Sequence, residues 1–217
     1  MGRTRLRLFA AVPLFLCLAA TTARAQQEQL FRNSWFWGLH AGATSIGTPS
    51  SPTTSAGTIG AEWMITRTDG GVYASYDQAN FTRTTDVADP TASNGTRRVA
   101  VRDLRTASLG AVAFPWHSGG FRPYAGLGYA LSIVGDASVQ PDSANTQVPS
   151  GIARTIDDAR SRASIFGMAG AQWQIRRTAI FAQASFIPSN DKFLITKPLT
   201  TIVAGIRYNF GSALEGQ

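Results

Sequence analysis

Cysteine and histidine are almost absent from this 217-residue chain, which contains one Cys and two His. A single Cys cannot form an intramolecular disulfide, and it cannot supply the thiolate cluster of a zinc or iron–sulfur site. Charged residues make up only 15% of the chain, whereas 44% of the residues are hydrophobic and 10% are aromatic. This composition is too apolar for a disordered chain and predicts one folded domain without thiol-based chemistry.

The first 25 residues have the order of a secretory signal peptide. Three Arg precede an apolar run from Leu8 to Ala20, and Ala23 and Ala25 flank Arg24 at a small-x-small cleavage site. Cleavage after Ala25 would leave 192 residues with 16 basic and 13 acidic groups, a net charge of +3. So small a surplus offers no basic stripe that could neutralise consecutive phosphates, and no nucleic-acid partner is expected.

Long hydrophobic runs are also missing after residue 25. The longest uncharged stretches, such as 106–121, are interrupted by Gly, Pro, Ser and His. A membrane-spanning helix needs about 18 or more consecutive apolar residues, whereas a membrane-spanning strand needs only about 9 to 11. The sequence therefore argues against a helical membrane protein and leaves a strand-based one open.

Period-two alternation of apolar and polar residues recurs along the chain and predicts β-strands. In the last segment, Ile202, Ile206 and Phe210 share one face, while Gly205 and Asn209 take the other. Eight such segments rich in Gly and aromatic residues are expected near residues 34–46, 55–66, 71–82, 97–114, 121–135, 162–175, 178–188 and 199–211.

The connections between these segments alternate in length. Short ones occupy 67–70, 115–120 and 176–177. Long polar ones occupy 47–54, 83–96, 136–161 and 188–198. In an up-and-down meander this places the short turns at one end and the long loops at the other, which is typical of bacterial outer-membrane barrels.

Two motifs resemble the small eight-stranded outer-membrane β-barrel family, the outer-membrane protein A/X-like domains. The run from Gly205 to Phe210 is similar to the family's C-terminal insertion signal, in which a Gly precedes aromatics three and five residues later, here Tyr208 and Phe210. The run from Arg122 to Gly128 resembles the start of a central strand of that family. The resemblance implies a single all-β, eight-stranded antiparallel up-and-down transmembrane β-barrel, recognised by the barrel-insertion machinery through Gly205, Tyr208 and Phe210.

Barrel geometry predicts the same inside-out arrangement without the family. Eight strands enclose an interior that side chains fill, so the apolar faces must point to lipid and the polar faces inward. An aromatic girdle is expected at the short-turn end, formed by Trp35, Trp37, Trp63, Phe114, Trp116, Phe121, Trp173, Tyr208 and Phe210. Asp103 and Arg105 fall on the lipid-facing side of their strand, which predicts that this strand extends above the bilayer there.

A polar cluster is expected inside the barrel, because five inward-facing residues lie at similar height from the short-turn end: His40, Glu62, Gln172, Gln183 and Arg207. The first, second and last strands become neighbours on closure, so Glu62 and Arg207 are expected to pair near His40. A buried charge without a partner costs several kcal/mol, which favours this pairing. A polar filling is the more economical interpretation, and a proton or ligand site is the alternative.

No catalytic, cofactor or metal site is expected. His117 and Ser118 are adjacent in a turn, where side chains seldom have the geometry of a nucleophile and its base. Asp136, Asp142, Asp157 and Asp158 lie in the longest loop at spacings that match no calcium-binding loop. We interpret them as solvated loop acids.

The domain plan is therefore a signal peptide at 1–25, a short periplasmic lead-in at 26–33, the barrel at 34–211 and a tail at 212–217. The predicted function is that of a bacterial outer-membrane protein with a structural or surface-interaction role, whose partners are membrane lipids, the insertion machinery and an extracellular ligand at the loops. Three alternatives remain at this point: an outer-membrane lipid-modifying hydrolase, a soluble periplasmic lipocalin-like carrier of an apolar ligand, and a small-solute channel.

Overall fold

The structure is a computed structural model that describes residues 30–48, 51–88, 95–116, 119–135, 137–139, 161–189 and 197–212. The predicted signal peptide lies outside the described residues, as does the tail beyond Ser212. The turn residues His117 and Ser118 and the loop acids Asp136, Asp142, Asp157 and Asp158 also lie outside them.

Nine strands make up the described secondary structure. They are β1 (Ser34–Thr48), β2 (Ser51–Thr66), β3 (Gly70–Ala88), β4 (Thr96–Ala113), β5 (Phe121–Val134), β6 (Ala137–Val139), β7 (Ser161–Ile175), β8 (Thr178–Ile187) and β9 (Lys197–Ser212). No helix within the described ranges is long and apolar enough to cross a membrane.

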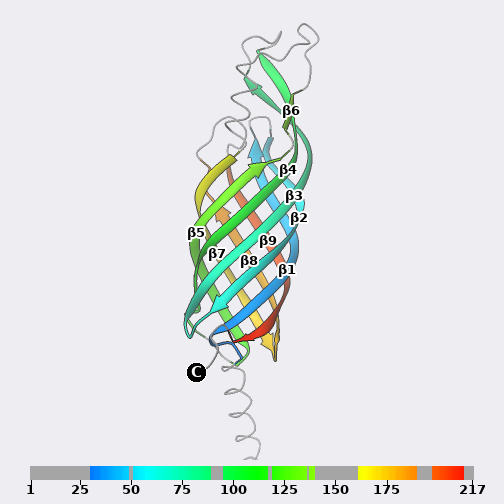
Figure 1. Ribbon diagram of the computed structural model, residues 1–217. Helices are drawn as coiled ribbons and strands as arrows, with labels where there is room; N and C mark the ends of the chain where they lie inside the picture. The colour runs from blue at the N-terminus through cyan, green and yellow to red at the C-terminus, as the bar shows by residue number, and fades with distance from the viewer. Residues whose placement is uncertain are drawn as a thin grey trace, which may run out of the picture.

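The eight long strands form a closed antiparallel barrel (Figure 1). Each pairs with its sequence neighbours, β5 pairs directly with β7, and β9 pairs with β1 to close the ring. The three-residue β6 pairs only with the upper part of β4. The predicted fold class, an eight-stranded up-and-down barrel, is confirmed.

Alternation along each strand puts apolar side chains outside and polar or bulky ones inside. On β5, Leu127 and Tyr129 are 75% and 72% exposed, whereas Tyr124 and Ala130 are buried. On β9, Ile202 and Ile206 face outward, while Arg207 is completely buried. A water-soluble barrel would have the opposite arrangement, because large apolar side chains are rarely exposed in such numbers.

The outward apolar band has the height of a bilayer. On β5 it runs from Phe121 to Ile133, about 40 Å of strand at 3.3 Å per residue. At the tilt of about 45° common in membrane barrels, this covers about 28 Å, close to the thickness of a hydrocarbon core. The band ends on the neighbouring strands at a polar patch, where Gln78 pairs with Arg105 and Asn80 pairs with Asp103.

The girdle prediction is wrong at Phe114. Trp35, Trp37, Trp173, Tyr208 and Phe210 are exposed on the outer wall, Trp116 is exposed beyond the end of β4, and Trp63 and Phe121 are half-buried. Phe114, by contrast, is 1% exposed and belongs to the core. Phe114 follows Val112 on the inward side of β4, so its position obeys the alternation. It closes the interior at the short-turn end by contact with Phe31 and Tyr124.

Three predicted loops contain more strand than the sequence indicated. The connection predicted at 47–54 is largely strand, since Thr48 pairs with Ser51. β3 and β4 continue to the pair Ala88 and Thr96. Part of the loop predicted at 136–161 forms β6. Alternation fades where a strand leaves the membrane and both faces become polar, although backbone pairing continues.

Candidate functional site

The five residues predicted for the interior cluster all lie inside the barrel. His40 comes from β1, Glu62 from β2, Gln172 from β7, Gln183 from β8 and Arg207 from β9, and none is more than 8% exposed. Register explains their common height, since Gly38 of β1 pairs with Glu62 on one side and with Arg207 on the other. Gly38 leaves the space in which these two side chains meet, because a Cβ there would crowd both.

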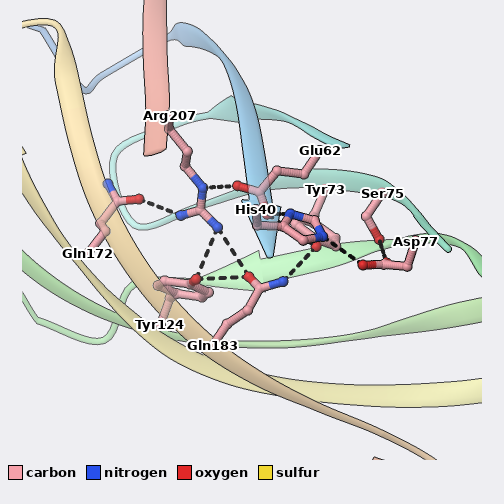
Figure 2. Close-up of polar contacts among 9 residues, drawn as sticks. All are labelled: His40, Glu62, Tyr73, Ser75, Asp77, Tyr124, Gln172, Gln183 and Arg207. Carbon is pink, nitrogen blue, oxygen red and sulfur yellow. Dashed lines mark hydrogen bonds and ion pairs between the residues drawn. The ribbon is translucent and has the colours of Figure 1, made fainter. Parts of the chain in front are cut away.

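Arg207 is the centre of the cluster (Figure 2). Its Nε donates to Glu62 Oε1 in a buried ion pair. Nη1 donates to Gln172 Oε1 at 2.6 Å, and Nη2 lies within hydrogen-bond distance of Tyr124 Oη at 3.0 Å and Gln183 Oε1 at 3.2 Å. The guanidinium also stacks on Phe181, 3.9 Å from the ring centroid. Arg207 thus contacts side chains of β2, β5, β7 and β8.

A second set of bonds continues around the interior. Tyr124 Oη donates to Gln183 Oε1 at 2.9 Å, and Gln183 Nε2 donates to Tyr73 Oη at 2.9 Å. Tyr73 in turn donates to Glu62 Oε2 at 3.3 Å. Both Glu62 oxygens are therefore bound, which a buried carboxylate requires.

His40 joins this cluster to a second acid. Its Nε2 lies 2.6 Å from Asp77 Oδ1, and its Nδ1 lies 3.8 Å from Glu62 Oε2. Ser75 Oγ donates to Asp77 Oδ2 at 3.2 Å. The connected groups thus include two carboxylates, one guanidinium and one imidazole.

Sequence reasoning missed Tyr73, Asp77 and Tyr124. Tyr124 follows from extending the β5 alternation two residues below Gly126, which places it on the inward face. Tyr73 and Asp77 were hidden by Gln78, whose polar side chain interrupts the outward face of β3. Most polar atoms of the cluster bind one another, and its largest members are buried, which is typical of a polar filling; His40 Nδ1 and Gln172 Nε2 are buried without a hydrogen-bond partner. Within the described ranges, no group of three potential metal ligands occurs.

The short-turn end of the barrel is closed by the segment that precedes β1. Phe31 is 1% exposed and packs edge-on against Phe114 with ring centroids 4.8 Å apart, while the Arg122 guanidinium lies 4.1 Å from its centroid. The Phe31 carbonyl accepts from Thr66 Oγ1. We call residues 30–33 the N-terminal plug.

Side chains of β1, β7 and β9 bind the backbone of the N-terminal plug. Ser34 Oγ donates to the Leu30 carbonyl at 3.0 Å. Asn209 Nδ2 donates to the same carbonyl, and Gln174 Nε2 lies 3.4 Å from it. The predicted periplasmic lead-in therefore includes residues that enter the barrel.

The long-loop end carries a sheet that rises above the barrel wall (Figure 1). Beyond the polar patch, β3 and β4 continue through six further pairs from Arg83 to Ala88, about 20 Å at 3.3 Å per residue. β6 adds a third strand alongside Val99 to Val101. We call this the protruding sheet. Asp103 and Arg105 lie just below it and form an ion pair at 2.7 Å.

The predicted insertion-signal residues lie on β9 beside the first strand. Gly205 faces the interior, where an added Cβ would overlap the Leu39 carbonyl oxygen, and Tyr208 and Phe210 face outward with ring centroids 5.1 Å apart. Their role in insertion stays a prediction.

Sequence comparison finds no matching family model and no matching curated protein. Comparison with solved structures finds several barrels. The attachment invasion locus protein Ail of Yersinia pestis superposes with a TM-score of 0.51 at 13% identity, over 82% of this chain and 99% of that one. Neisserial surface protein A superposes with a TM-score of 0.54 at 11% identity, over 81% of this chain and 97% of that one.

A second structure of Ail holds the heparin analogue sucrose octasulfate, and it superposes with a TM-score of 0.50 at 16% identity, over 82% and 99% of the two chains. Identities this low establish the fold. Together with the closed ring of antiparallel strands, they show that the chain has the fold of the small eight-stranded outer-membrane β-barrels.

Proposed function

We propose that this chain is a bacterial outer-membrane protein that binds other molecules through its extracellular end and carries out no catalysis. The protruding sheet is the observation that carries the surface-binding role. A barrel that served only as a membrane filler would need no further 20 Å or so of paired strand beyond the polar patch. Extracellular loops on rigid barrels are where such proteins meet other molecules.

The outer wall supports the membrane location. Leu39, Leu127, Tyr129 and Ile202 are each more than 60% exposed. A group of exposed aromatics lies at the short-turn end, where an interfacial girdle belongs: Trp35, Trp37, Trp173, Tyr208 and Phe210. A soluble lipocalin-like carrier would have to keep this surface in water. The predicted signal peptide supports export.

The membrane location is tested by migration of residues 26–217, refolded in detergent micelles, on a denaturing gel with and without boiling. A compact unboiled band that shifts on heating, together with aggregation when detergent is omitted, is the expected result. A folded monomer that is soluble without detergent would mean that the apolar faces point inward, and it would favour the lipocalin-like carrier.

Anionic polysaccharide is the ligand class that the long-loop end favours. Arg98, Arg102, Arg105 and Lys197 are exposed there, and Asp86 and Asp103 are the acids paired with two of them. A sulfated sugar bound to Ail provides a probe with the same charge.

Heparin binding by cells that display the protein tests this role. Replacing residues 83–101 with Asn-Gly removes the protruding sheet and leaves the membrane part of β3 and β4 intact. The shortened protein, with Arg102→Gln and Lys197→Gln added to remove the two exposed cations that remain without an ion pair named above, should keep its heat-dependent gel shift and lose most heparin binding. Arg67→Gln, at the short-turn end, is the matched control and should bind as the natural chain does. Equal binding by the shortened protein would contradict the proposal.

A lipid-modifying hydrolase remains the alternative from another class. Of the two His, His40 is buried in the interior network and not at the long-loop end. Lipid hydrolysis by the purified barrel that disappears in His117→Ala would establish the enzyme and refute the non-catalytic role.

A further inference from the structure

The outer wall contains an apolar hollow at the seam between β1 and β9. Its volume is about 660 Å³, within the range of small-molecule sites. Ala41, Ala61 and Ala204 form its floor, and Leu39 and Ile206 stand beside them. We call this the seam groove.

Pairing explains the shape of the seam groove. Ala41 lies opposite Ala204, and Leu39 lies opposite both Ala61 and Ile206. The small pair Ala41 and Ala204 therefore lies next to the large pair Leu39 and Ile206, which leaves a hollow in the wall. Towards the short-turn end the groove is bordered by the exposed aromatics Trp37, Tyr208 and Phe210.

A second hollow of about 420 Å³ lies at the short-turn end of the same seam. Its charged lining residues are Arg32 of the N-terminal plug and Arg177 of the β7–β8 turn, and no Asp or Glu is among the residues that line it. We call this the basic hollow.

The two hollows share the end of β9. Tyr208 and Phe210 border the seam groove, while Asn209 and Gly211 line the basic hollow. Backbone pairing places Trp37 beside Tyr208 and Trp35 beside Gly211. Tyr208 and Phe210 point outward and Asn209 points inward, so the seam groove lies on the outer wall and the basic hollow at the rim of the same end of the seam.

We propose that the β1–β9 seam binds an anionic phospholipid of the periplasmic leaflet, with an acyl chain in the seam groove and the phosphate at Arg32 and Arg177. This inference rests on the proposed membrane location. One lipid molecule carries both an apolar tail and an anionic head, and the exposed Arg32 and Arg177 lie at the rim to which the seam groove runs, so a headgroup at the rim would reach them. Cationic side chains near a membrane surface attract anionic headgroups, and aromatic side chains hold the interface.

Fluorescence quenching by brominated lipids provides the test. The mature chain is reconstituted in phosphatidylcholine vesicles with Trp37 as the only Trp, and brominated phosphatidylglycerol or brominated phosphatidylcholine is added in increasing proportion. The matched control keeps only Trp173, which is 53% exposed on β7 against 52% for Trp37. Trp173 lines neither hollow and reports general lipid contact.

Phosphatidylglycerol should quench Trp37 with an apparent association constant at least about fivefold above that of phosphatidylcholine, since one cation near an anionic surface contributes about that factor. Trp173 should show no such preference. Replacing both Arg32→Gln and Arg177→Gln should reduce the Trp37 preference to the level of Trp173. Ala204→Phe, which fills the groove floor, should weaken quenching of Trp37 by both lipids.

Each contrary result overturns the inference in a distinct way. An equal preference of Trp37 and Trp173 for phosphatidylglycerol would mean that anionic headgroups are attracted along the whole rim and not at the β1–β9 seam. A preference that emerges only when the chain is cut after Ser212 would mean that residues beyond β9, Glu215 among them, compete with the lipid for the two Arg. Absence of the heat-dependent gel shift would instead refute the membrane location itself.

Discussion

Arg207 illustrates how a single buried charge organises the interior. It has no exposed surface, and its hydrogen bonds reach side chains on four other strands. Removing one partner of a buried ion pair costs more than removing both, because the remaining charge stays buried without compensation.

Replacing Arg207→Leu should lower the free energy of unfolding by about 3 to 5 kcal/mol, measured by urea titration in lipid vesicles. Adding Glu62→Gln should recover part of that loss, since no buried carboxylate then remains unpaired. Arg98→Leu is the control: its ion pair with Asp86 is exposed, and the change should stay within about 1 kcal/mol. Unchanged stability of the Arg207 variant would refute the central role of this residue.

Gly205 is expected to be required for packing, apart from any role in insertion. Gly205→Ala should refold poorly from urea into detergent, where no insertion machinery is present, because the added Cβ would overlap the Leu39 carbonyl oxygen and contact the His40 side chain. Tyr208→Ala, at an exposed position of the same motif, should refold normally under these conditions. The measurement is the fraction of heat-shifted band, and equal yields for the two variants would contradict the packing role.

At the scale of elements, the N-terminal plug is fixed in place by side chains from several strands. It receives side-chain hydrogen bonds from β2 and β9, a cation–π contact from β5, and aromatic packing from β1 and Phe114. With Ser34 and Gln174, which bind the Leu30 carbonyl, seven inward residues at the short-turn end therefore contact this one segment.

Phe31→Ala should reduce the free energy of unfolding by about 3 to 5 kcal/mol, the usual cost of truncating a buried Phe. Thr68→Ala, in the exposed β2–β3 turn, should change it by less than about 0.5 kcal/mol. The same urea titration measures both. A negligible effect of Phe31→Ala would show that the plug contributes no packing energy.

The strands could be predicted from the sequence wherever one face meets lipid, because there a residue on the wrong face is costly. The five predicted interior residues followed from this rule on β1, β2, β7, β8 and β9. On β3 and β4 the rule loses force near Gln78, Asp103 and Arg105, since these outward positions lie at the membrane boundary. β6 lacked any signal, because three residues are too few to show a period and their pairing with β4 is long-range.

For the whole molecule, the described interior is filled from end to end. Phe31 and Phe114 close the short-turn end, the Arg207 network occupies the middle, and Ile46, Phe81 and Leu104 are buried towards the long-loop end. An eight-stranded barrel is just wide enough for its own side chains.

Ion conductance in a planar bilayer should therefore be absent for the refolded natural chain. Glu62→Ala combined with Arg207→Ala, which empties only the middle, should also remain closed, because aromatic and aliphatic side chains still block both ends. Stable, stepwise currents from the natural chain would contradict a filled interior and restore the small-solute channel.

The unequal strand lengths give the molecule a tall side and a low side. β8 has 10 residues, whereas β3 has 19, so the rim slopes. On a cell whose surface is coated with polysaccharide, a large molecule that approaches from outside reaches the long strands β3 and β4 first. The coat shields the side of the rim formed by the short strand β8. Antibodies raised against intact cells, and phage that adsorb to them, should therefore bind the β3–β4 side of the rim more often than the β8 side.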